Sequence, residues 1–282
     1  MKIRIAYHTE YTYEQEVSFS PHLFRLFPRA DYFLGVESVS FRTNAGADVQ
    51  YRRDIFDNEI ARCFYPGKNR VLEAALEIEL DVRERNAFHF LLERHAVDFP
   101  FQYKEEEKIV LEPFLAVGGE TVSLPFWTPQ ASPAFTVTAL VELNEALFAN
   151  IQYERREDGP ARPPAETLAL RSGACRDFAV LLAAVLRSLG IAARLASGYL
   201  CEFGESEKRA QGALHAWVEA YIPGAGWLGM DPTNGVLCNH NHITAAVGLT
   251  PGDITPVDGI YYGKTHVPSV MTAGLEMIQC DR

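Results

Sequence analysis

The sequence predicts an α+β fold, in which a β-rich, sandwich-like N-terminal domain precedes a core with a helix packed on an antiparallel sheet. Three patterns of apolar residues carry this prediction. Apolar and polar residues alternate in the first 84 positions, helical spacing follows Cys175, and alternation returns over residues 214–231. The expected units are a β-rich N-terminal domain (1–84), a helical and loop connector (85–135) and a core (136–282).

The composition sets broad limits on the protein. Its 282 residues, 48% hydrophobic and 22% charged, are typical of a soluble globular chain of one large or two ordinary domains. The formal net charge of −11 argues against a nucleic-acid partner and against an anionic membrane surface. No apolar run approaches the roughly 18 residues of a membrane span, and the N-terminus lacks the apolar core of a signal peptide.

The number and spacing of the cysteines indicate the redox state of the cellular compartment. There are five of them, an odd number, and they are widely scattered without a C-x-x-C pair. This usage fits a reduced environment better than a disulfide framework, so a cytoplasmic protein is expected. The sequence does not specify an oligomeric state.

Two alternating segments define the N-terminal domain. Ile3 and Ile5 alternate with charged neighbours, and residues 76–83 alternate so regularly that a strand with one dry and one wet face is predicted. Asp57-Asn58 separates two strand-like segments, 51–56 and 60–65, and predicts a hairpin turn between them.

The pattern changes from Arg85 onward. Residues 87–96 are expected to form a helix, whereas the prolines and glycines of 113–135 predict a loop. Further elements of the core are helices over 138–149 and 165–170 and a strand over 192–201.

Cys175 is the residue around which the core is expected to be organised. It follows a Gly-Ala pair and opens an apolar run at i, i+3, i+4 spacing, and Gly190 lies where such a helix would end. Cys175 should therefore lie in the first turn of a helix of roughly four turns. Unpaired N–H groups and the positive end of the helix dipole favour a thiolate there, which lowers the thiol pKa from its usual ~8.5.

A second pair of residues could activate this thiol. His215 and Asp231 lie sixteen residues apart, in two alternating segments joined by a turn that is centred on Pro223. In an antiparallel hairpin they would face each other on one side, or form a diagonal pair if the register slips. The carboxylate could then accept the imidazole N–H and stabilise the imidazolium. Together the three residues predict a thiolate–imidazolium nucleophile.

The motifs around these residues resemble a known family. They are Gly173-Ala174-Cys175-Arg176-Asp177-Phe178-Ala179, His215-Ala216-Trp217-Val218-Glu219 and Asp231-Pro232-Thr233-Asn234-Gly235. In this order they resemble the bacterial transglutaminase-like superfamily, whose core is related to papain, over about residues 150–260. Residues 22–29 and Asp57-Asn58 are similar to the β-sandwich-like domain that precedes the core in that family. One departure, Gly248-Leu249-Thr250-Pro251 in place of a Gly-Arg-Asp-Tyr-like stretch, concerns the cleft wall rather than the three residues.

The resemblance implies a reaction. Cys175 would be the nucleophile, His215 the base and acid, and Asp231 the residue that orients the imidazole. A peptide or amide substrate would form a thioester, which water (cysteine peptidase or amidase) or an amine (transglutaminase) would release. Hydrolysis is expected, with acyl transfer and a non-catalytic binding module that kept the fold as alternatives. The hypothesis requires no cofactor and no metal.

The donors to the oxyanion are only partly specified. The backbone N–H of Cys175 is one expected donor, and Gln152, Tyr153 and Trp127 are candidates for the other. Asp177, in the first turn of the helix, is expected to complement the helix dipole.

A competing interpretation concerns a metal. Cys238, His240 and His242 could share a strand face and bind zinc, although no fourth ligand has suitable spacing. This interpretation is therefore the weaker one.

Overall fold

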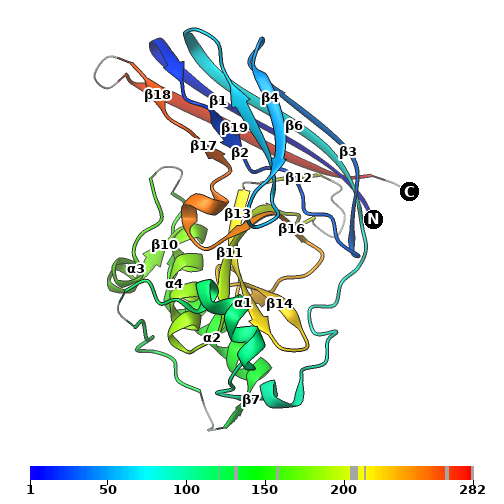
Figure 1. The fold of residues 1–282 in the computed structure, drawn as a ribbon, viewed down its shortest axis with the longest axis vertical. Helices are drawn as coiled ribbons and strands as arrows, with labels where there is room; N and C mark the ends of the chain where they lie inside the picture. Colours follow the sequence, from blue (N-terminus) through cyan, green and yellow to red (C-terminus); the bar gives the residue numbers. More distant parts are fainter. Residues whose placement is uncertain are drawn as a thin grey trace.

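The computed structural model describes residues 1–119, 121–129, 133–156, 159–203, 209–212, 214–263 and 267–280. Figure 1 shows two parts, one above the other: β-sheets above, and below them a mixed part of sheet and helices. Both chain ends lie at the same edge of the upper part. Among the described residues, no helix has the length and apolar character needed to cross a membrane.

The upper part contains two antiparallel sheets. The larger has the order β12-β19-β1-β6-β3, with β18 also paired to β1, and the smaller has the order β17-β2-β5-β4. Strands of the larger sheet are β1 (Lys2–Phe19), β3 (Leu34–Thr43), β6 (Asn69–Val82), β12 (Arg209–Gln211), β18 (Tyr261–Tyr262) and β19 (Ser269–Cys280). Strands of the smaller sheet are β2 (His22–Phe24), β4 (Asp48–Arg53), β5 (Glu59–Phe64) and β17 (Val257–Asp258).

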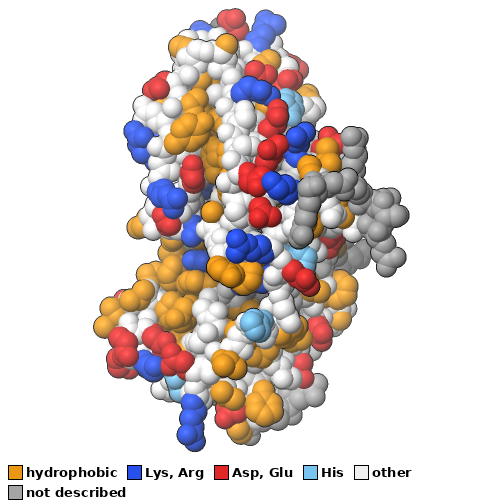
Figure 2. All heavy atoms as spheres, turned by 90° about the vertical axis from the view of Figure 1, so that its right-hand side faces the viewer, with side chains coloured by type: hydrophobic (Ala, Val, Ile, Leu, Met, Phe, Trp, Pro, Cys, Tyr) orange, Lys and Arg blue, Asp and Glu red, His pale blue; other side chains and the backbone are white. Residues whose placement is uncertain are grey.

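The alternation predicted for the N-terminal strands is present. Ile5 of β1 and Ile78 of β6 are paired and fully buried, facing apolar side chains of the smaller sheet. On the other face, Arg4 contacts Glu79 at 3.0 Å. Figure 2 shows side chains of both charges on the surface of the upper part. Since apolar side chains of both sheets meet in one core, the N-terminal part is a sandwich. The predicted turn at Asp57-Asn58 joins β4 to β5, with Asp57 in the left-handed region at φ 61°.

The last strand of the chain lies beside the first. β19 pairs with β1 from Lys2↔Cys280 to Tyr13↔Ser269, so a segment from the range assigned to the core completes the N-terminal sheet. The domain boundaries at residues 84/85 and 135/136 stay a prediction.

The lower part is built on a five-stranded antiparallel sheet with the order β15-β14-β13-β11-β16. Its strands are β11 (Ala193–Leu200), β13 (Leu214–Ile222), β14 (Gly226–Asp231), β15 (Val236–Leu237) and β16 (His242–Gly248). The helices are α1 (Glu105–Leu115), α2 (Thr136–Asn150), α3 (Pro164–Leu170) and α4 (Cys175–Ser188). Shorter elements are η1 (Arg94–Ala96), η2 (Pro251–Ile254), β7 (Asp98–Phe99), β8 (Ala134–Phe135), β9 (Gln152–Tyr153) and β10 (Ser172–Gly173).

The two faces of this sheet have different covers. Leu195 and Val218 are buried against the apolar side of α4, in one core with Phe178. Side chains of the opposite face point toward the sandwich, where the Tyr199 hydroxyl donates to the carbonyl oxygen of Leu26 at 2.7 Å. The sheet therefore separates the helices from the N-terminal part (Figure 1).

Two expectations for the connector are wrong. Residues 87–96 do not form a helix, and only η1 is helical there. The segment instead runs along the β13–β14 turn, where the Glu93 N–H donates to the Pro223 carbonyl at 3.0 Å. Tertiary contact thus replaces helical hydrogen bonds. The predicted loop over 113–135 begins later than expected, because Pro113 lies in the last turn of α1.

Candidate active site

Cys175 is the first residue of α4, as predicted. Ala174 before it is extended at φ −83° and ψ 170°, and the helix ends before Gly190, which has φ +76°. The N–H of the first helical residue has no intrahelical partner, so it can donate to a ligand. The chain enters the helix from β10, which pairs in parallel with β9. This pairing places Gln152 and Tyr153 beside the start of α4.

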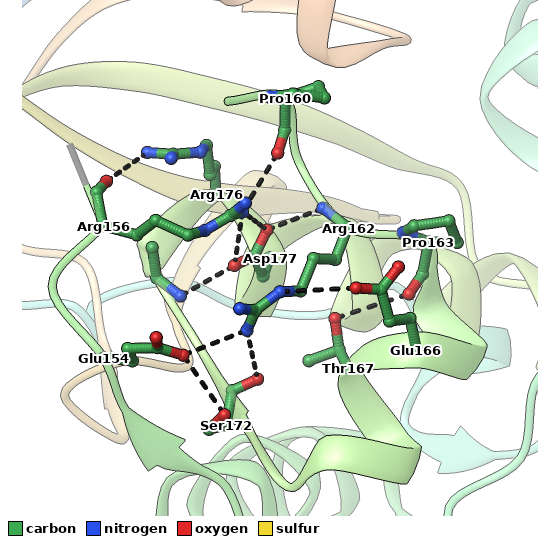
Figure 3. A network of polar contacts seen from close by, with 11 residues as sticks. Glu154, Arg156, Pro160, Arg162, Pro163, Glu166, Thr167, Ser172, Arg176 and Asp177 are labelled. Atoms are coloured by element: carbon green, nitrogen blue, oxygen red, sulfur yellow. Dashed lines mark hydrogen bonds and ion pairs between the residues drawn. The ribbon is translucent and has the colours of Figure 1, made fainter. Parts of the chain in front are cut away.

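The first turn of α4 is held by the buried carboxylate of Asp177 (Figure 3). Its Oδ2 accepts the N–H of Ala174 at 2.8 Å, and its Oδ1 accepts the N–H of Arg162 at 2.7 Å. The Arg156 guanidinium contacts the same carboxylate at 2.7 Å. Asp177 therefore does more than complement the helix dipole, because it fastens a preceding loop to the helix that begins with Cys175.

A second arginine ties the same loop to β10. Arg162 Nη1 donates to Glu154 Oε2 at 3.1 Å and to the Ser172 carbonyl at 3.2 Å. Arg176 Nη1 donates to the Arg156 carbonyl at 2.9 Å (Figure 3). These contacts leave the backbone on both sides of Cys175 fixed by charged side chains.

His215 and Asp231 are in contact. His215 Nε2 lies 2.8 Å from Asp231 Oδ2. The hairpin pairs Val218 with Met230, which centres it on Gly224 rather than on Pro223 and makes His215 and Asp231 diagonal neighbours. The diagonal alternative is thus the one found. Gly224 has φ +92° and an added Cβ would lie 2.3 Å from the Leu91 carbonyl, so this turn requires glycine.

Asp231 is a fully buried carboxylate with five hydrogen-bond donors. Its Oδ1 accepts the N–H groups of Thr233 and Asn234 at 3.0 and 3.3 Å. Its Oδ2 accepts from Asn234 Nδ2 at 2.8 Å, from His215, and from His242 Nε2 at 3.1 Å. Burial would raise the pKa of Asp231, but the hydrogen bonds from His215, His242 and Asn234 hold it well below its usual range.

The charges of the cluster are coupled. Burial lowers the pKa of His215, but hydrogen bonds to Asp231 and Cys175 outweigh it and raise that pKa to about 10. Burial likewise raises the pKa of Cys175, but the hydrogen bond and charge of His215, with the Ala216 N–H and Arg176, lower it overall. Asp231 occupies Nε2 of the imidazole, which leaves Nδ1 for the sulfur. Trp217 stacks on the His215 ring at 6.1 Å between centroids.

The other buried cysteines show the contrast. Burial raises the pKa of Cys63 to about 11 and that of Cys201 to about 12. Burial also acts to raise the pKa of Cys175, but the facing His215 imidazolium lowers it overall.

His242 was missed as a member of this cluster and was considered as a zinc ligand instead. Its Nδ1 accepts the Asn239 N–H at 3.4 Å, so its Nε2 carries the proton that it donates to Asp231. Among the described residues, no group of three His, Cys, Asp or Glu side chains could hold a metal ion. Asn144 of α2 was also missed, and it donates to the backbone carbonyl of Asp231 at 3.1 Å.

The candidates for the second oxyanion donor lie in different settings. Tyr153 is 52% exposed, and burial and then the nearby charge of Cys175 raise the pKa of its phenol. Trp127 Nε1 is buried, and no described residue accepts its hydrogen. Gln152 is exposed beside Tyr153 on β9. None of the three is singled out by a hydrogen bond.

A cavity of about 430 Å³ adjoins the cluster. Its walls include Phe178, one turn along α4 from Cys175, and Thr233, which caps Asp231. The remaining lining residues are 148–153 and Arg171. Phe148 and Tyr153 are 54% and 52% exposed, so the rim of the cavity is aromatic.

Two family models match the chain. Residues 128–232 match the model described as transglutaminase-like superfamily, and residues 3–82 match that of the bacterial transglutaminase-like N-terminal region. The chain thus has a bacterial transglutaminase-like N-terminal region followed by a transglutaminase-like core. Cys175, His215 and Asp231 all lie within the matched core of this superfamily.

A solved structure shares the fold of this transglutaminase-like chain. It is described as a "Putative Cysteine Protease" from Cytophaga hutchinsonii, and it is 17% identical with a TM-score of 0.67. The similarity covers 100% of this chain and 92% of that one, and it concerns the fold. The core is therefore papain-like, and the β-rich N-terminal region belongs to the same architecture.

Relatives that are similar in sequence match shorter parts of the chain than this structure does. An uncharacterised protein of Mycobacterium leprae is 42% identical over 94 residues, 33% of each chain. Another, of Mycobacterium tuberculosis, is 33% identical over 160 residues, 52% of this chain and 51% of that one. A protein-glutamine gamma-glutamyltransferase of Pseudomonas aeruginosa is 44% identical over 69 residues, 22% of this chain and 10% of that one. The matched part of this chain thus spans about half or less of these relatives.

Proposed function

We propose that this protein is a thiol-dependent amide hydrolase, a cysteine peptidase or amidase, with Cys175 as its nucleophile. The observation that carries the proposal is the chain of contacts from buried Asp231 through His215 to a thiol of lowered pKa at a helix N-terminus. This arrangement supports a thiolate–imidazolium pair near neutral pH. The match of residues 128–232 to the transglutaminase-like superfamily model agrees with cysteine-dependent chemistry.

Acylation uses both members of the pair. The Cys175 thiolate attacks the amide carbon, and the carbonyl oxygen becomes an oxyanion that the free N–H at the start of α4 can stabilise. The His215 imidazolium then donates its proton to the leaving nitrogen as the C–N bond breaks. The products of this step are a thioester on Cys175 and a free amine.

Deacylation reverses the proton transfer. Neutral His215 accepts a proton from water, the resulting hydroxide attacks the thioester carbon, and the C–S bond breaks. A carboxylic acid leaves and the thiolate–imidazolium pair is restored. Cys175 retains solvent access in the structure, which supports water as the acceptor.

The adjoining cavity is proposed to hold the acyl side of the substrate. Its aromatic rim and the buried ring of Phe178 favour an apolar side chain, while Arg171 supplies one positive charge. The Arg171 guanidinium lies 4.6 Å over the ring of Phe126, so it is held at the cavity wall rather than free to swing.

Acyl transfer to an amine is the second candidate. It is favoured by the relative from Pseudomonas aeruginosa, whose name states glutamyl transfer and which matches 69 residues of this chain. Transfer requires that a neutral amine reach the thioester ahead of water. The net charge of −11 would attract a lysine-bearing acceptor, which makes this route a reasonable alternative.

One experiment distinguishes these candidates and also a non-catalytic module. Cys175 is acylated by an activated ester, and the breakdown of the acyl-enzyme is followed in a single turnover with and without a millimolar primary amine. Hydrolysis predicts free acid in both reactions, and transfer predicts capture of most of the acyl group by the amine. If the wild-type protein is acylated no faster than a Cys175→Ser variant, and the acyl group is not released, the protein is a binding module without catalytic activity.

A further inference from the structure

A second cavity, of about 290 Å³, lies between the sandwich and the core sheet. Its core walls include Arg194 and Glu219, which are paired across β11 and β13. These residues alternate with Leu195 and Val218, whose side chains pack with α4. The cavity is therefore on the face of the sheet opposite the body of α4.

The cavity has an excess of positive charge. Its charged lining residues, apart from histidines, are Arg29, Arg83, Arg85, Arg194, Asp31 and Glu219. Arginines outnumber carboxylates by two in a chain whose net charge is −11. In Figure 2 the right-hand side of Figure 1 faces the viewer. Lys and Arg side chains lie there on the surface between the upper and lower parts.

Some of these charges already have partners. Arg194 contacts Glu219 at 2.6 Å and lies 4.2 Å over the ring of Trp227. Arg29 donates through Nη1 to Asn58 Oδ1 at 2.9 Å. Asp31 Oδ1 accepts backbone N–H groups of its own loop, at 2.7 and 2.8 Å. These groups build the walls of the cavity.

Arg83 and Arg85 are different. Among the described residues, neither guanidinium has a hydrogen-bond acceptor or a carboxylate partner; they lie over the rings of Tyr32 and Phe33, at 5.2 and 5.5 Å. His240, also in the lining, has a buried Nδ1 without a partner in the described part of the chain. Arg83 is exposed and Arg85 is half-buried, so both guanidinium groups can reach an anion in the cavity, and no described carboxylate pairs with either. Buried polar atoms are usually satisfied, so the buried Nδ1 of His240 indicates a missing partner.

We propose that this cavity binds a small oxyanion carrying two negative charges, of the phosphate or dicarboxylate class. Guanidinium groups present paired N–H donors that match phosphate and carboxylate oxygens. A volume of about 290 Å³ corresponds to about ten water molecules at ~30 Å³ each. That space suits a phosphate monoester or a short dicarboxylate and is too small for a polymer segment.

The position of the site connects it to the rest of the molecule. Its ligands come from the end of the sandwich (Arg83), from the connector (Arg85) and from the core (His240), so a bound anion bridges these parts. His242 lines the same cavity and donates to Asp231 on its other side. An occupant would thus lie one side chain away from the buried carboxylate of the candidate active site.

The test uses the whole chain and four probes at constant ionic strength: inorganic phosphate, succinate, acetate and chloride. Trp227 lies in the cavity wall, so ligand binding is followed by tryptophan fluorescence and by the shift in melting temperature. Phosphate or succinate should bind saturably and raise the melting temperature, whereas acetate should bind more weakly and chloride not at all. Whichever dianion binds more tightly assigns the class.

Substitutions locate the site. The double variant R83Q/R85Q should weaken binding of the dianion at least about tenfold. The matched control R42Q/R70Q removes the same charge from exposed positions of the sandwich and should leave the affinity unchanged within about twofold. If the double variant does not fold, exposed Arg83 is replaced alone. Dianions that act no differently from chloride, or an equal loss in the control, would overturn the proposal.

Discussion

Replacing Asp231 with asparagine tests the candidate active site most directly. The substitution keeps the shape of the side chain but removes the buried charge that faces His215 at 2.8 Å. Without this charge the imidazolium is less favoured, and so is the thiolate that pairs with it. Cys175 should therefore become a less reactive nucleophile while the fold is retained.

The expected magnitude follows from the pKa of His215. A rise from 6.5 to about 10 corresponds to ~5 kcal/mol in favour of the imidazolium. His215 is only 11% exposed, so solvent screening reduces this energy little. Asp231 and Cys175 share the effect, and assigning about half of it to Asp231 gives ~2.5 kcal/mol, or roughly a sixtyfold smaller population of the ion pair.

The assay is the rate at which iodoacetamide alkylates Cys175, measured by mass spectrometry across the pH range. In the native protein Cys175 should react before the other four cysteines, with a midpoint below the ~8.5 of a free thiol. In D231N the rate near pH 7 should fall roughly sixtyfold and the midpoint should move toward that of a free thiol. The control D98N makes the same change at an exposed position of β7.

Stability gives a second measurement on the same variant. The raised pKa of His215 contributes stability that is complete below about 6.5 and is lost as the pH rises toward about 10. The lowered pKa of Asp231 contributes stability that is complete above the usual carboxyl pKa of 3.8 and is lost as the pH falls further below it. The difference in unfolding free energy between wild type and D231N should thus be larger at pH 5 than at pH 9. A folded D231N with an unchanged alkylation profile would refute the reasoning.

Three further substitutions have definite expected outcomes. Asp177→Ala should lower the free energy of unfolding in urea by about 3 kcal/mol, because its arginine partner loses a buried carboxylate; an effect below about 1 kcal/mol would contradict this. Gly198→Ala should destabilise by at least about 2 kcal/mol, since the added Cβ would lie 2.0 Å from the Ile243 carbonyl; a wild-type melting temperature would show that the strands can move apart. His242→Gln should slow alkylation of Cys175 several-fold but less than loss of Asp231 does, as one of five donors to that carboxylate is weakened; an effect equal to that of D231N would place His242 in the nucleophile pair itself.

Local patterns in the sequence determined the parts of the site that depend on near neighbours. The position of Cys175 at the start of α4 followed from an apolar run of helical spacing and from Gly190, because both act within a few residues of the chain. The contact of His215 with Asp231 was predictable for the same reason, since a short hairpin limits the pairs that can form. These features needed no knowledge of distant segments.

Tertiary structure alone decided the rest. His242 reaches Asp231 because β16 pairs with β11, whose register is interrupted by an irregularity after Ser197 that no local pattern shows. Residues 87–96 do not form an α-helix because the turn at Gly224 offers them a hydrogen bond and close packing in place of helical contacts. The arginine-lined cavity likewise needs three distant segments to meet. Pairings between distant segments depend on the free energy of the whole packed chain, so a local sequence pattern cannot specify them.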